Sequence, residues 1–288
     1  MKTELKIFFT IWIIYIFFLT NYGGDHMADS MLEGTMAFVD TGSFEITNYT
    51  KEQCKIVPSG CNNAFYNGKI YPGFPPGNSI IATPVYLLAK PFFNLLPEQI
   101  GEYSRLRISA ILLNILATIF IISILSALIA VLVYKFLGHI TKNKKNRLFI
   151  TFVFAFGTLF FLYSTEYYAK TIATFFLFSS FYLLFLMKNK KIKKSKKLLF
   201  LTALLSSLAV TFEYSSILIV GLLFLYLLSF FRNKEIIYYL TGLMIPIILL
   251  LSYHYFIFDN AFSSTYQYHK PTTYYPIVAE KDISLPTI

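Results

Sequence analysis

The sequence predicts an all-α polytopic membrane protein with about seven transmembrane helices. Of its 288 residues, 56% are hydrophobic and only 14% are charged, and the mean hydropathy is +0.59. A soluble domain of this size could not bury so much apolar surface. The other two observations are a series of seven apolar segments and the clustering of lysines in short loops between them. The formal net charge of +10 therefore orients the chain in a bilayer and does not indicate nucleic-acid binding.

The first apolar segment lies near residues 7–22 and follows Lys2 and Lys6. It is short for a span, and a cleaved signal peptide is the alternative. No small-x-small cleavage site follows it, and the bulky run FFL near its end would suit one poorly. We therefore predict a retained anchor whose N-terminus lies in the cytoplasm.

Residues 21–42, NYGGDHMADSMLEGTMAFVDTG, predict a short amphipathic helix directly after this anchor. On a helix, four acids fall on one side and most apolar residues on the other. These acids are Asp25, Asp29, Glu33 and Asp40. Such a helix, tethered to a span, is expected to lie along the bilayer surface. Its carboxylates could bind a metal, act as a general base, or be solvated.

The long loop at 23–103 is acidic in balance, which places it outside the cytoplasm. Cys54 and Cys61 are the only cysteines in the chain, and in this location they predict a small disulfide-closed loop. A metal-binding pair is less favoured, because no histidine or third cysteine lies nearby in the sequence. The sequence therefore predicts a disulfide between these two cysteines within the long loop.

The stretch YNGKIYPGFPPGNSIIATPVY at 66–86 combines prolines, which fix φ, with glycines, which allow unusual backbone conformations. It predicts a stiff, shaped loop that enters an apolar helix; a plain surface turn is the alternative. That helix, at 79–96, is interrupted by two prolines and Lys90. We expect it to lie on the membrane surface or to re-enter, and not to cross.

Six further apolar segments predict spans. They lie at 106–137, 148–163, 171–187, 198–212, 217–231 and 236–258. Basic residues mark alternate connections between them, whereas the connections around Glu166 and Glu213 are nearly free of basic residues. Seven crossings then leave the loop at 23–103 and the segment at 259–288 outside. Residues 1–258 thus form one transmembrane module, and the external segment is expected to lead into a further C-terminal part.

Several motifs carry a resemblance to a known family. AFVDTGSF ends the acidic helix and GKIYPGFPPG leads into the next apolar helix; FGTLFFLYSTEYYAKTIATFFLF, SLAVTFEYSS and YHYFIFDNAFSSTYQY follow in order. Together they resemble the N-terminal transmembrane module of GT-C glycosyltransferases, similar to protein O-mannosyltransferases and other enzymes that use lipid-linked sugars. The resemblance covers nearly the whole chain. Each motif alone is only moderately specific. The resemblance is supported mainly by the order of the motifs along the chain.

The resemblance implies an extracytoplasmic active site that moves a sugar from a polyprenyl- or dolichyl-phosphate donor to a protein, lipid or glycan acceptor, with inversion expected. In this family the acid after the first span is the expected catalytic base, and Asp25 occupies that position. Many relatives follow it with a second acid, where this chain has His26. A divalent cation, if used, would therefore need Asp29 beside Asp25. The predicted substrate loop comprises Tyr71, Pro75, Pro76 and Gly77.

Phosphate leaves as a stable anion, so this chemistry needs fixed positive charge and no protonating acid. The candidates for binding the donor phosphate are Arg107, Lys170 and Lys69. Arg107 suits phosphate bidentately, and interfacial snorkelling is the alternative for it. Glu166 is a candidate supporting acid, because an ionisable group at a span end is costly and Lys170 lies one helical turn further on.

Two other function classes remain open: a transporter or flippase of a lipid-linked substrate, and a non-catalytic membrane scaffold. A transporter would place charged residues or broken helices near the middle of the bilayer. Here the ionisable residues lie at segment ends, so glycosyl transfer is the leading prediction. Within the acidic helix it assigns chemistry to Asp25 with support from Asp29, and it leaves Glu33 and Asp40 solvated.

Overall fold

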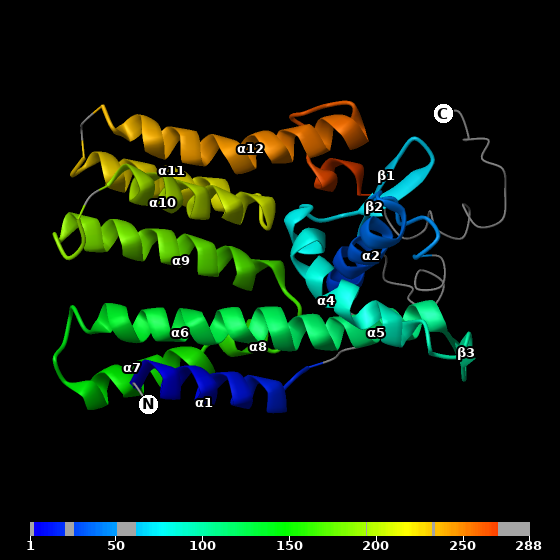
Figure 1. The fold of residues 1–288 in the computed structure, drawn as a ribbon, viewed down its shortest axis with the longest axis horizontal. Helices are drawn as coiled ribbons and strands as arrows, with labels where there is room; N and C mark the ends of the chain where they lie inside the picture. The colour runs from blue at the N-terminus through cyan, green and yellow to red at the C-terminus, as the bar shows by residue number, and fades with distance from the viewer. Residues whose placement is uncertain (1–2, 21–25, 51–61, 194, 232–233, 270–288) are drawn as a thin grey trace. The chain divides into compact units, whose positions relative to one another are not determined.

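The computed structural model describes residues 3–20, 26–50, 62–193, 195–231 and 234–269. This part of the chain is mostly helical and also contains two antiparallel two-stranded sheets (Figure 1). It divides into two compact units. The helical unit comprises Met1–Asn21 and Ile115–Tyr253, and the loop unit comprises Tyr22–Asn114 and His254–Ile288.

Helices occupy all seven predicted apolar segments. They are α1 (Thr3–Phe17), α5 (Arg105–Ala117), the π-helical turn η1 (Thr118–Ile122), α6 (Ser123–Leu137), α7 (Lys144–Phe156), α8 (Phe160–Ser164), α9 (Ala169–Lys188), α10 (Lys196–Leu208), the 3₁₀ turn η2 (Ala209–Thr211), α11 (Ser216–Leu228) and α12 (Ile236–Phe258). The segment predicted at 148–163 is not continuous. It breaks at Gly157, and the hydroxyl of Thr158 accepts a hydrogen bond from the backbone N–H of Phe160, which starts α8 anew.

Three of these helices are long and apolar enough to cross a membrane. They are Arg105–Leu137, Ala169–Lys188 and Ile236–Phe258. Ser216–Leu228 is a shorter apolar helix. The described residues therefore support a helical membrane protein, and the seven-span count remains a prediction.

Small and polar residues hold the helical unit together where helices meet. On α6, Ala127 and Ala130 are fully buried against α1, and their small side chains let the two helices approach closely. Tyr15 of α1 donates a hydrogen bond to the carbonyl of Ala155 at 3.1 Å. Between α9 and α10, Ser180 donates to the carbonyl of Thr202 at 2.9 Å. In an apolar environment such bonds satisfy groups that would otherwise stay unpaired.

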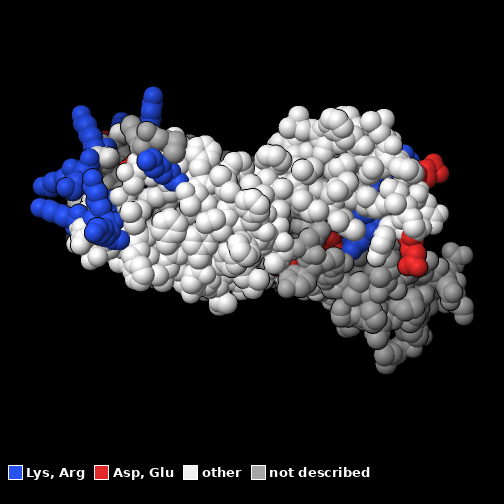
Figure 2. Space-filling model, turned by 90° about the horizontal axis from the view of Figure 1, so that it is seen from below, with Lys and Arg blue, Asp and Glu red and all other residues white. Residues whose placement is uncertain are grey.

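Lysine and arginine side chains gather at one end of the helical unit (Figure 2). At this end α6 is followed by α7, and α9 by α10 (Figure 1). The exposed lysines of these connections are Lys135, Lys142, Lys144, Lys145, Lys188, Lys190, Lys191, Lys193, Lys196 and Lys197. This is the distribution that the positive-inside rule expects at a cytoplasmic face.

The loop unit contains strands that the all-α prediction missed. Strands β1 (Asn63–Tyr66) and β2 (Lys69–Pro72) form a hairpin, and β3 (Gln99–Ile100) pairs with β4 (Tyr103–Ser104). The first hairpin turns through Asn67 and Gly68, both with positive φ. Asn-Gly between two short apolar runs is the strongest local hairpin signal. The amino-acid composition favours helices throughout, so the predicted all-α fold does not include this hairpin.

Helix α2 (His26–Thr41) is buried over most of its length, and two acids of the predicted stripe, Asp29 and Glu33, do not face water. Every residue from Ala28 to Ala37 is buried, Asp29 and Glu33 included. The reason is close packing against α4 (Gly77–Phe93) and β2. A Cβ at Gly34 would meet Pro72 and Ser79 side-chain atoms at 2.5 Å, so glycine permits this approach. Ser79 also donates a hydrogen bond to the carbonyl of Met31 at 2.7 Å.

The opposite face of α4 is exposed and apolar. Its large exposed side chains are Ile80, Leu87, Leu88 and Phe92, with Leu95 just beyond the helix end. An apolar face of this kind suits a helix that lies on a bilayer surface. The membrane-surface position itself remains a prediction.

The segment after α12 returns to the first hairpin. Thr265, in the 3₁₀ helix η3 (Thr265–Tyr268), donates a hydrogen bond to the carbonyl of Gly73 at 2.9 Å, and His269 Nε2 lies 2.8 Å from the same oxygen. His269 also forms a β-bridge with Ala64. A Cβ at Gly73 would lie 2.0 Å from the carbonyl oxygen of Asn62, so only glycine fits there. This contact closes the loop unit across nearly two hundred residues of sequence.

Candidate functional site

The predicted catalytic base and the predicted disulfide fall outside the described residues. These are Asp25, Cys54 and Cys61, and their roles remain predictions. Asp25 immediately precedes His26, where α2 begins. The described part of the candidate site consists of residues on α2 and of residues that contact this helix.

The structure brings together two predicted site residues, Asp29 and Arg107. Arg107 Nη1 donates a hydrogen bond to Asp29 Oδ2 at 3.0 Å, and the two side chains are only 8% and 6% exposed. Asp29 lies in the first turn of α2 and Arg107 in the first turn of α5. Arg107 is therefore buried and paired, and snorkelling to the interface does not describe it. A buried guanidinium held by one carboxylate is a fixed positive group that costs little to reorganise.

Glu33 lies one turn further along α2 and belongs to the same buried cluster. It is 3% exposed, which corrects the prediction that it would be solvated. Burial raises its pKa well above the ordinary value, and the nearby Asp29 carboxylate adds to this; Arg107 and a hydrogen bond from Thr50 act in the opposite direction. The Thr50 hydroxyl also accepts a hydrogen bond from Asn63 Nδ2 at 3.0 Å. We call Asp29, Glu33, Thr50, Asn63 and Arg107 the buried polar cluster.

Two members of the buried polar cluster, Thr50 and Asn63, were not predicted. They flank the stretch that contains both cysteines. Thr50 ends the sequon Asn48-Tyr49-Thr50, a pattern that indicates glycosylation and not a buried cluster. The contacts of Thr50 with Asn63 and Glu33 depend on the tertiary fold, so no local pattern predicts them.

The other cations predicted to bind phosphate have different surroundings. Lys69 forms an exposed ion pair with Glu45 at 2.9 Å in the loop unit. Lys170 belongs to the helical unit, where it is exposed with its ammonium 5.5 Å from the centre of the Tyr168 ring. Glu166 is partly buried in the connection between α8 and α9. Of the three cations, only Arg107 is buried next to another predicted site residue.

The residues of the predicted substrate loop are buried, and their stiffness and substrate role remain predictions. Tyr71, Pro75, Pro76 and Gly77 all lie in the buried stretch that joins β2 to α4. Pro76 has a φ of −65° and forms the N-cap of α4, for which proline is already suited. The alternative of a plain surface turn is therefore wrong, because packing against α2 and η3 covers the loop.

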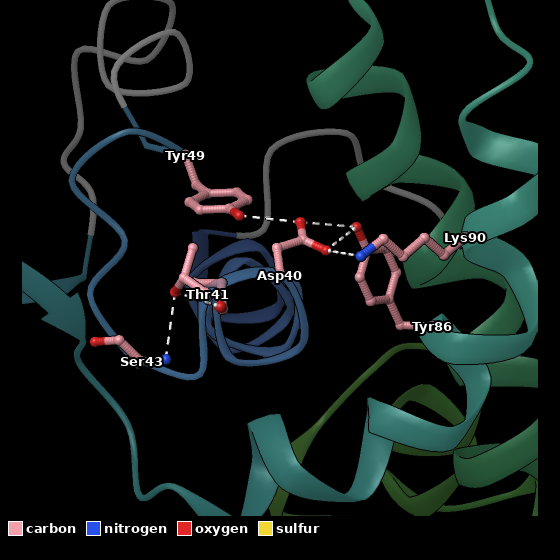
Figure 3. Close-up of polar contacts among 7 residues, drawn as sticks. Asp40, Thr41, Ser43, Tyr49, Tyr86 and Lys90 are labelled. Carbon is pink, nitrogen blue, oxygen red and sulfur yellow. Dashed lines mark hydrogen bonds and ion pairs between the residues drawn. The ribbon is translucent and has the colours of Figure 1, made fainter.

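Asp40, also predicted to be solvated, is held by three side chains (Figure 3). Its carboxylate accepts hydrogen bonds from Tyr49 at 3.0 Å and from Tyr86 at 3.1 Å, and it forms an ion pair with Lys90 at 2.6 Å. A carboxylate in the last turn of a helix faces the negative end of the helix dipole. Lys90 offsets this charge, and burial together with Asp40 raises the pKa of Tyr49 and of Tyr86. The contacts join α2, α4 and the segment after α2.

Replacing Asp40 with asparagine is expected to destabilise the loop unit by about 1–2 kcal/mol. Hydrogen bonds to a charged group contribute about 1.5–3 kcal/mol, but partial exposure of Asp40 and Lys90 screens their attraction. Thermal unfolding in detergent measures the loss. The matched control is Glu45→Gln, which breaks the exposed pair with Lys69 and should change little. Equal effects of the two substitutions would contradict the structural role of Asp40.

The described residues contain no group of three or more His, Cys, Asp or Glu side chains placed to hold a metal ion. At Asp29, one carboxylate oxygen is already bonded to Arg107, and that guanidinium would repel a cation. The Asp29 carboxylate is thus engaged by a guanidinium in this structure. The suggested cation at Asp25 remains untested.

No protein-family model, curated protein or solved structure matches the chain significantly. The chemistry of the site thus rests on the residues themselves and on their geometry.

Proposed function

We propose that the chain is a membrane glycosyltransferase that moves a sugar from a polyprenyl-phosphate donor to an acceptor at the extracytoplasmic face. The observation that carries the proposal is the buried Asp29–Arg107 pair at the start of the helix Arg105–Leu137. At about 1.5 Å per residue, this 33-residue helix is about 50 Å long, so it extends beyond a hydrocarbon core of about 30 Å. We expect Arg107, near its first end, to lie outside the hydrocarbon core and within reach of lipid phosphates.

The orientation of that helix also supports an external site. Its other end carries Lys135 in the last turn of α6, before the basic connection to α7. Basic connections of this kind favour the cytoplasmic side. Arg107 is then at the extracytoplasmic side, where the loop at 23–103 provides Asp25 and the substrate loop.

The proposed reaction is a single displacement. The acceptor hydroxyl loses its proton to the Asp25 carboxylate as its oxygen bonds to the anomeric carbon. The bond between that carbon and the phosphate oxygen breaks, and the electron pair leaves with the phosphate. Arg107 stabilises the charge that develops on the phosphate, and Asp29 orients the guanidinium. One displacement at the anomeric carbon predicts inversion.

The test is donor consumption by the purified full chain in lipid nanodiscs. We expect it to convert a polyprenyl-phosphate-linked hexose or pentose to free polyprenyl phosphate when acceptor fractions from membranes are supplied. Mock-purified nanodiscs without the protein are the control. In proteoliposomes, movement of intact donor between leaflets without consumption would instead support a flippase. Binding of donor with neither outcome would support a scaffold and overturn the proposal.

A further inference from the structure

Two buried oxygen atoms of the buried polar cluster lack a hydrogen-bond donor among the described residues. They are Oε2 of Glu33 and Oδ1 of Asn63. Glu33 is 3% exposed and Asn63 is 1% exposed, so bulk water does not reach either group freely. A buried acceptor without a donor destabilises the folded state, because it has lost its hydrogen bonds to water. Two of them in one cluster therefore need an explanation.

Both residues are linked through the same hydroxyl group. Thr50 accepts a hydrogen bond from Asn63 Nδ2 at 3.0 Å and donates its own hydrogen to the Glu33 carboxyl group. This hydroxyl has one hydrogen, so it cannot also serve the second oxygen of Glu33. The unsatisfied oxygens thus belong to the two groups that meet at Thr50.

Among the described residues, no positive charge near Glu33 is paired with it alone. On its own helix Asp29 lies one turn away, and on α5 Arg107 is already bonded to Asp29. The other elements packed against α2 carry cations that are paired elsewhere: Lys90 of α4 with Asp40 and Lys69 of β2 with Glu45. An ionised Glu33 would add a second buried negative charge beside a single positive one. This arrangement is costly, so the neutral acid is favoured.

We propose that Glu33 binds a proton at neutral pH and, as the neutral carboxylic acid, donates a hydrogen bond through Oε2 to Oδ1 of Asn63. Only an O–H bond forms, and the proton comes from solvent water as the chain folds. The added hydrogen satisfies both orphan oxygens at once. It also leaves the three ionisable groups of the cluster electrically neutral in sum, with Asp29 and Arg107 as an ion pair. The proposal does not depend on glycosyl transfer.

This proton links stability to pH. The pKa of Glu33 is raised in the folded state, so the folded chain binds more protons than the unfolded chain. The stabilisation associated with neutral Glu33 is fully present below the unfolded pKa, near 4.3. It is lost as pH rises from there through the folded pKa. Glutamine mimics the neutral acid and does not titrate, so Glu33→Gln should remove this loss.

The experiment is infrared spectroscopy of the purified full chain in nanodiscs at neutral pH. We expect the carbonyl stretch of a protonated carboxyl group in the wild type and its loss in Glu33→Gln. Glu45→Gln is the matched control, because Glu45 is an exposed partner of Lys69, which lowers its pKa, and the band should persist. A wild type without the band, or a band that survives in Glu33→Gln, overturns the proposal.

A second variant keeps the test decisive if Glu33→Gln does not fold. Asn63→Ala removes the proposed acceptor but leaves Glu33 in place. The protonated-carboxyl band should then remain and shift to higher frequency, because its O–H group has lost a partner. An unshifted band would show that Asn63 is not the acceptor.

Discussion

Replacing Arg107 with methionine is expected to destabilise the loop unit by about 3–5 kcal/mol. The substitution leaves Asp29 as a buried carboxylate whose counterion is gone, and breaking a buried pair on one side typically costs this much. Thermal or denaturant unfolding in detergent measures the change. The control lies two residues away: Arg105 forms an exposed pair with Glu98 at 3.9 Å, and Arg105→Met should change stability by less than about 0.5 kcal/mol.

A double substitution distinguishes a lost ion pair from lost packing. Arg107→Met combined with Asp29→Leu removes both charges and leaves apolar side chains of similar bulk, so much of the lost stability should return. The coupling energy of the double-mutant cycle reports the interaction between the two side chains. If Arg107→Met behaves like Arg105→Met, or if the double variant is no better than the single one, the pair does not stabilise the fold.

Composition and hydropathy were sufficient to predict the helical architecture. Apolar runs of sufficient length form helices in lipid because the backbone must satisfy its own hydrogen bonds there. The ends of these helices and the break at Gly157 were less predictable, since caps depend on single residues. In the part of the chain that the structure describes, three helices meet the length and hydropathy needed for a span, and the remaining crossings are predicted from the sequence pattern.

The acidic helix shows why a periodic pattern can mislead. Asp29, Glu33 and Asp40 form a polar stripe, and a polar stripe normally faces water. In α2 the stripe instead meets polar partners from other parts of the chain: Arg107, Thr50 and Lys90. Charge periodicity indicates that a face is polar but does not identify whether water or protein covers it.

The contact between Asp29 and Arg107 could not be predicted from the sequence, for a related reason. Asp29 and Arg107 were both proposed as site residues, but 78 positions separate them and no spacing rule connects them. Their contact depends on the packing of α2 in the loop unit. That packing depends on Gly34, whose missing side chain lets Pro72 and Ser79 lie close to the helix. The position of α2 that brings Asp29 to Arg107 thus depends on packing, which charge alone could not predict.

Asp25→Asn is expected to lower the rate of sugar transfer by about 10²- to 10⁴-fold, the usual contribution of a general base. Asparagine keeps the shape of the side chain but cannot take the acceptor proton. Because the proton moves only in the transition state, kcat and kcat/KM for the donor should fall together while the donor KM stays the same. Initial rates of donor consumption at several donor concentrations measure both constants.

The control for this substitution is Asp259→Asn, an acid of the loop unit that accepts a hydrogen bond from Tyr66 at 2.9 Å. It lies in no proposed reaction step, so its rate should match that of the wild type. Asp29→Asn, in contrast, should lower the unfolding temperature, because it weakens the buried Asp29–Arg107 pair. An active wild type whose rate survives Asp25→Asn would move the base to another residue and leave the transferase proposal standing. A wild type that consumes no donor would reject the transferase itself, whatever Asp25 does.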